Sequence, residues 1–182
     1  MNLVTVGLWG AAIGCGVMAG IYFAFSTFVM RALGVIPQPA GIAAMQSINE
    51  VIVSSAFLPL FFGTTLVGVG LAGWSLPHWG EPGTSALVAG GAVYLFGMFV
   101  CTVGLNVPLN DALAAVDPSG LEAATLWSDY LERWTRWNHV RTVASGVACG
   151  LFIVAIAARA QVDGVPGNAI GVPSVTKAII ER

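Results

Sequence analysis

Residues 134–158 read WTRWNHVRTVASGVACGLFIVAIAA, and this stretch decides the fold. Its last 17 residues carry no charge, whereas its first eight hold two arginines, a histidine, an asparagine and two tryptophans. A helix of that apolar length measures roughly 25 Å, which is short of the about 30 Å of hydrocarbon in a bilayer. We therefore expect a membrane span that borrows residues from the polar part and draws Asn138, His139 and Arg141 toward low dielectric.

The rest of the chain has the same uneven distribution of charge. Of its 182 residues, 57% are hydrophobic and 9% are charged, against roughly 45 to 50% and about 25% in a typical soluble domain. Charged residues are absent from 1–29, 51–79, 82–110 and 142–158. Because a helix needs about 20 apolar residues to cross a bilayer, each of these gaps predicts a span. The sequence therefore predicts an all-α, multi-pass integral protein of the cell membrane.

The predicted fold is an antiparallel bundle of four transmembrane helices within a domain covering residues 1–159. The predicted spans cover about 3–30, 51–75, 84–106 and 137–158. Pro59 is expected to kink the second span, and Pro108 is expected to end the third, because proline removes a backbone donor. Residues 160–182, rich in glycine, proline and valine, are expected to form a poorly ordered tail outside the bundle.

We call residues 134–141 the polar motif. Two shorter elements are expected at the end of the bundle that holds it. In the first loop Ile42, Met45 and Ile48 recur at helical spacing, which predicts a short amphipathic helix. A turn at residues 117–120 precedes a helical extension that starts near Leu121 and leads into the last span.

Several classes of function and site have no support in the composition. The net charge of -2 and the lack of a basic stripe speak against nucleic-acid binding. The three cysteines lie inside predicted spans without paired spacing, which favours packing over disulfides or metal binding. The two histidines are predicted at opposite ends of the bundle, which argues against a bis-histidine haem. Arg31 follows the first apolar run and nothing basic precedes it, so we expect this segment to remain in the mature protein.

The topology brings three groups of polar residues to one end of the bundle. Asn106 and Asn110 end the third span, the first loop contributes Gln46 and Asn49, and the polar motif begins the fourth. Ionisable groups drawn into a membrane tend to line cavities or pathways. Under an alternative interpretation, the tryptophans form an interfacial belt, the arginines extend to lipid headgroups and the histidine is an ordinary interfacial residue.

Four segments resemble a known family of small membrane proteins. They are GIYFAFSTFVMRAL (20–33), PAGIAAMQSIN (39–49), NVPLND (106–111) and WTRWNHVR (134–141). Together they resemble the family once called DUF1772 and now described as anthrone-oxygenase-like, over about residues 7–158. The resemblance implies oxidation of a polycyclic anthrone by dioxygen, with no cofactor expected. It also implies a dry aromatic pocket that holds a base and a partner for an enolate oxygen.

The residues that match these motifs supply candidates for each role. His139 is the candidate base, because histidine is the residue type that titrates near neutral pH. Arg141 is the candidate partner of the developing oxyanion. The candidate substrate-binding residues are Asn106, Asn110, Asn138, Trp134, Trp137, Tyr22 and Phe25. The expected partners are a hydrophobic small molecule, dioxygen and the lipid bilayer.

Two other functions stay open at the level of sequence. One is a non-catalytic subunit or assembly factor of a larger membrane complex, or a homo-oligomer, joined through glycine-rich helix faces such as Gly10/Gly14 and Gly16/Gly20. The other is a protein that binds a lipid-soluble metabolite without oxidising it.

Overall fold

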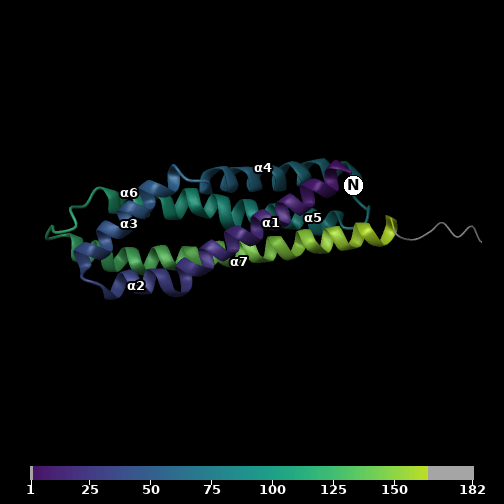
Figure 1. Cartoon of the computed structure of the whole chain (residues 1–182). Coiled ribbons are helices and arrows are strands. Elements are labelled where there is room, and N and C mark those ends of the chain that lie inside the picture. The colour runs from purple at the N-terminus through teal and green to yellow at the C-terminus, as the bar shows by residue number, and fades with distance from the viewer. Residues whose placement is uncertain (1, 164–182) are drawn as a thin grey trace, which may run out of the picture.

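The computed structural model describes residues 2–163, which form an elongated antiparallel helical bundle (Figure 1). The elements in chain order are α1 (Leu3–Ala24), the π-helix η1 (Phe25–Val29), α2 (Met30–Val35), α3 (Gln38–Val53), α4 (Phe57–Ser75), the 3₁₀-helix η2 (Leu76–His78), α5 (Thr84–Tyr94), the π-helices η3 (Leu95–Val100) and η4 (Thr102–Asn106), α6 (Val107–Ala114) and α7 (Ala123–Asp163).

Four continuous helical stretches are long and apolar enough to cross a membrane. They are Leu3–Val35, Phe57–His78, Thr84–Ala114 and Ala123–Gln161. Successive stretches run in opposite directions, so that α2, α3, α6 and the start of α7 lie at one end, which we call the polar end (Figure 1). The predicted all-α, four-span fold is therefore confirmed, including the helix in the first loop and the helical extension before the last span.

The core of the bundle forms where α7 packs against α1 and α5, with α4 completing the fourth side. Its fully buried side chains include Met18, Leu87, Tyr94, Met98 and Phe152. A second hydrophobic cluster lies at the polar end, where Met30, Ile42, Met45, Leu113 and Trp127 are buried together. The periodicity of Ile42 and Met45, read from the sequence, thus marks the face of α3 that packs on the bundle.

The second span begins later than the sequence predicted. The loop helix α3 continues to Val53, and α4 starts only at Phe57. The non-helical residues 54–56 interrupt the helical path between them. The hydroxyls of Ser54 and Ser55 donate to the carbonyls of Val51 and Ile52, which satisfies acceptors at the end of α3. Pro59 accordingly lies in the first turn of α4, where its missing donor has no helical partner to lose, and not in the middle of a span.

The third span does not stop at Pro108. Two π-helical segments, η3 and η4, precede α6, and the helical path continues to Ala114. Pro108 lies in the first turn of α6, directly after the wider turn of η4. That wider turn changes the hydrogen-bond register just where the proline could not donate, so the helix continues beyond residue 106.

The last span is part of one helix of 41 residues, α7, which is longer than the predicted span 137–158. It includes the entire polar motif, and it extends through the first residues of the predicted tail. The remainder of that tail, residues 164–182, lies outside the described residues.

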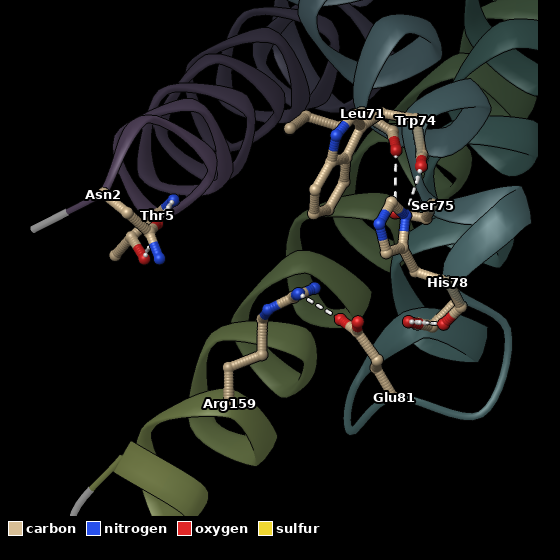
Figure 2. A network of polar contacts seen from close by, with 9 residues as sticks. Asn2, Thr5, Leu71, Trp74, Ser75, His78, Glu81 and Arg159 are labelled. Atoms are coloured by element: carbon tan, nitrogen blue, oxygen red, sulfur yellow. Dashed lines mark hydrogen bonds and ion pairs between the residues drawn. The ribbon is translucent and has the colours of Figure 1, made fainter.

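The end opposite the polar end is held by a short network around the loop between α4 and α5. Arg159 of α7 donates to Glu81 at 3.0 Å, and Figure 2 shows these two side chains pointing toward each other. The guanidinium also lies over the ring of Trp74 at 5.7 Å, and the ring of His78 stacks on that same indole. Gly83 has φ of +81°, and a Cβ there would lie 2.7 Å from the carbonyl oxygen of Ala155, so this turn requires glycine. His78 therefore belongs to a loop that is fastened to α7.

The sequence predicts that several glycines of α1 lie at contacts with other helices, but only some of them do so. A Cβ on Gly14 would overlap the hydroxyl of Thr64 in α4 and lie 3.0 Å from its Cγ2. A Cβ on Gly10 or Gly20 would have no neighbour within 4 Å among the described residues. Gly14 therefore sets the distance between α1 and α4, whereas Gly10 and Gly20 leave open surface.

Gly14→Ala is expected to lower the free energy of unfolding by about 1 to 3 kcal/mol, because a β-branched threonine cannot move aside without a change of rotamer. Gly10→Ala is the matched control on the same helix and is expected to cause no loss. Denaturation in mixed detergent micelles, followed by circular dichroism, measures both variants. Equal stability of the two would contradict this assignment of the α1–α4 contact.

Candidate functional site

A cavity of about 620 Å³ lies at the polar end of the bundle, between η1, α3, the start of α4, η4, α6 and α7. Its aromatic walls are formed by Tyr22, Phe25, Phe57, Phe61, Phe62 and Trp134. Its polar lining includes Arg141, Asn110, Thr102, Glu50 and Asp111. The site is therefore a largely apolar chamber with a few polar groups, which is the usual composition of a small-molecule site.

Arg141 is the central polar residue of this chamber, and only 4% of it is exposed. Its guanidinium carbon lies 4.4 Å from the ring centre of Tyr22 and 4.9 Å from that of Trp134. Its Nη2 donates to Oδ1 of Asn138 at 2.7 Å. The two aromatic contacts stabilise the cation electrostatically, and the hydrogen bond fixes the orientation of its plane.

The positive charge of Arg141 has no carboxylate within ion-pair distance among residues 2–161. The ion pairs found there join Arg133 to Asp129, Arg136 to Glu132 and Arg159 to Glu81. The Nε of Arg141 also lacks a hydrogen-bond partner in this part of the chain. A buried charge is costly without a counterion, so the arrangement favours a ligand that brings a negatively charged or strongly polarised oxygen.

Asn138 holds Arg141 in place and joins α7 to α1. Its Nδ2 donates to the carbonyl of Tyr22 at 2.6 Å and to the hydroxyl of Ser26 at 2.7 Å. The hydroxyl of Ser26 also lies 3.2 Å from that of Thr142. Asn138 is fully buried and supports the arginine from behind.

Asn110 is fixed at the cavity wall by two donors from α7. Its Oδ1 accepts from Nε1 of Trp134 at 2.8 Å and from the hydroxyl of Tyr130 at 2.9 Å. Both rings also stack in series with Trp127 along α7. The wall of the cavity is consequently rigid on the side where α6 meets α7.

The structure brings most of the sequence-predicted site residues together, but not all. Tyr22, Phe25, Asn110, Trp134 and Arg141 line the cavity. Asn138 lies directly behind the lining, as described above.

Asn106, Trp137 and His139 are placed outside the lining. Asn106 is buried, donates to the carbonyl of Trp134 at 3.2 Å and has no partner for its Oδ1 among the described residues. Trp137 is half-buried, and its carbonyl accepts from the thiol of Cys101. His139 is exposed and borders a separate depression with Val93 and Val143. The imidazole is thus on a different face of α7 from Arg141.

Other lining residues were not among the sequence-predicted site. Thr102 and Val103 line the cavity from η4, and Phe57, Phe61 and Phe62 line it from α4. No periodic signal announces a π-helix, so the side chains that it redirects could not be assigned from sequence. Glu50 and Asp111 were recognisable only as the first charges outside apolar runs.

The candidate metal ligands are dispersed over the described residues. In the part of the chain that the structure describes, no three histidine, cysteine, aspartate or glutamate side chains gather closely enough to hold an ion. The polar groups of the cavity lining are the guanidinium, amides, the hydroxyls of Thr102 and Tyr22, and the two carboxylates.

These features define a multi-pass helical membrane protein with a buried cationic site in an aromatic chamber. A family model for anthrone oxygenase matches residues 51–151, which is more than half of the chain. The chain belongs to the anthrone oxygenase family. The matched region contains Asn106, Asn110 and the whole polar motif, whereas Tyr22 and Phe25 precede it. No curated protein and no solved structure matches the chain.

Proposed function

We propose that the protein is an oxygenase of the cell membrane that oxidises a hydrophobic polycyclic phenol or anthrone with dioxygen. The observation that carries this proposal is the guanidinium of Arg141, which lines an aromatic cavity without a carboxylate partner among the described residues. Family membership supports the same class of substrate. The expected partners are the small molecule, dioxygen and lipid.

The chemistry needs an anion that is stabilised away from water. Loss of a proton from the methylene of an anthrone sends the electron pair to the carbonyl oxygen and gives an enolate. This electron-rich enolate passes one electron to dioxygen, and the resulting pair combines into a peroxide at the former methylene carbon. Loss of water from the peroxide leaves the quinone, so one oxygen atom enters the product and the other leaves as water. Arg141 would hold the enolate oxygen, and an oxyanion partner of this kind contributes about 10² to 10³ in rate.

The dimensions and walls of the cavity support a fused-ring substrate. Its volume of about 620 Å³ falls within the range of roughly 300 to 1,000 Å³ common for small-molecule sites. The guanidinium of Arg141 already lies over the rings of Tyr22 and Trp134. A ligand oxygen would meet Arg141 at the edge of the guanidinium plane, where its N–H donors lie.

A lipid-soluble substrate would reach this cavity from the side. Among its lining residues, Val53, Phe62, Val103 and Val107 are exposed. We expect this apolar rim, which α3, α4, η4 and α6 form, to face lipid. Entry from the membrane fits molecules that partition into hydrocarbon.

A metabolite-binding protein that lacks oxidation is the second candidate, because the same cavity would serve it. Oxygen consumption separates the two functions. The purified protein in lipid nanodiscs is expected to consume dioxygen and form anthraquinone from anthrone, whereas a binding protein would take up the ligand without either change.

Arg141→Met is expected to lower the rate of oxygen uptake by about 10²-fold or more, because the enolate loses its cationic partner. Arg136→Met is the matched control, since it removes an exposed cation from the same helix that is paired only with Glu132. Circular dichroism verifies that both variants keep their helices. If the two variants oxidised anthrone equally fast, Arg141 would have no part in the reaction.

His139→Gln is expected to retain most of the oxygen uptake, because the imidazole is exposed and borders a different depression. This expectation departs from the role that the motif suggested for it. If His139→Gln folded but consumed no dioxygen, His139 would again be the candidate base.

A further inference from the structure

The proposed reaction needs a proton acceptor, and two carboxylates line the cavity. Asp111 of α6 and Glu50 of α3 both line the cavity, and both residues are exposed at the polar end of the bundle. We call this part of the lining, Glu50 and Asp111, the acidic mouth. Neither of the two histidines lines the cavity. The further inference rests on the function proposed above and concerns the residue that begins the reaction.

Asp111 occupies a defined place on the cavity wall. Val107, Asp111 and Ala114 follow one another at helical spacing in α6, and all three line the cavity. The preceding residue, Asn110, is held by Trp134 and Tyr130 of α7. The ring of Trp134 in turn lies against the guanidinium of Arg141. A continuous set of contacts therefore fixes the backbone of Asp111 relative to the oxyanion partner.

The carboxylate and the guanidinium share one cavity without forming an ion pair with each other. Arg141 is 96% buried and has a free Nε, and none of the ion pairs between described residues joins it to Asp111 or Glu50. A salt bridge would neutralise both groups and close the space between them. Their separation leaves that space for a substrate that presents an acidic C–H at one end and an oxygen at the other.

We propose that Asp111 is the general base that removes the methylene proton of the substrate. The C–H bond breaks, a carboxyl O–H bond forms at Asp111, and the electron pair moves through the ring to the oxygen held by Arg141. Because Asp111 is exposed at the mouth, its proton then passes to water. The base and the oxyanion partner thus act at two sides of the same bound ring system.

Asp111 is favoured over Glu50 on grounds of positioning. Glu50 lies in the last turn of α3, directly before the break at residues 54–56. Its side chain has one more rotatable bond, so more conformational freedom is lost when it is held in a reactive position. Asp111 follows a residue locked by two hydrogen bonds, and fixed geometry is what general-base catalysis requires.

Exchange of the methylene protons of anthrone with deuterium oxide tests this step without dioxygen. Wild-type protein in nanodiscs, kept anaerobic, is expected to accelerate exchange over nanodiscs without protein, as measured by mass spectrometry. Asp111→Asn is expected to lower the accelerated rate roughly 100-fold or to the background. It should still bind anthraquinone, measured by quenching of tryptophan fluorescence. Asp111→Glu is expected to restore part of the exchange.

Two further variants separate a base from a general effect of charge. Glu122→Gln removes an exposed carboxylate that does not line the cavity, and it is expected to exchange like the wild type. Glu50→Gln removes the same charge from the same mouth as Asp111→Asn. A loss in Glu50→Gln equal to that in Asp111→Asn would assign the effect to the charge of the mouth and overturn the proposal.

The remaining outcomes distinguish this inference from the proposed function. Unchanged exchange in a folded Asp111→Asn would overturn the assignment of the base while oxygen uptake by the wild type still upheld the oxygenase. Accelerated exchange that depends on Asp111, without oxygen uptake when air is admitted, would support the base and refute the oxygenase. Absence of acceleration by the wild type would overturn the assignment as well.

Discussion

The polar end of the bundle depends on the burial of one guanidinium that forms no ion pair with any described residue. Tyr22 and Trp134 cover Arg141, and Asn138 orients it through a hydrogen bond of 2.7 Å. Asn138 and Trp134 are in turn held by hydrogen bonds to Ser26 and Asn110. A cation in such surroundings is expensive unless something compensates it. The contacts with α1 and α6 are therefore arranged around the position of this charge, and the proposed ligand oxygen would complete the set.

The fold could be predicted because charge is excluded from four long segments. Finer features could be predicted only where no other local structure intervened. The helical spacing of Ile42 and Met45, for example, correctly identifies the buried face of α3. Pro108 did not end its helix, because the π-helix η4 precedes it. The position of the second span was misread for a similar reason, since the serines at residues 54 and 55 end one helix before the next begins.

The site could be predicted in location but only partly in composition. The helical spacing of α7 places Tyr130, Trp134 and Asn138 on a buried face and Glu132 and Arg136 on an exposed face. The same spacing left His139 on the exposed side, yet its chemistry attracted the role of base. Carboxylates contributed by α3 and α6 become visible only when the two helices are placed around one cavity. The family resemblance implied the reaction and residue type suggested the roles, whereas the three-dimensional placement leads us to propose a different base.

The most direct test of the account compares the binding of anthraquinone with that of anthracene, which has the same ring system but no oxygen. Titration of tryptophan fluorescence in nanodiscs gives both affinities for the wild type and for Arg141→Met, and the ratio between the proteins removes the effect of lipid partitioning. A hydrogen bond to a charged group is worth about 1.5 to 3 kcal/mol, so the wild type should prefer the quinone roughly 10- to 100-fold more than the variant does. An identical preference in both proteins would contradict the claim that Arg141 receives the oxygen of the ligand.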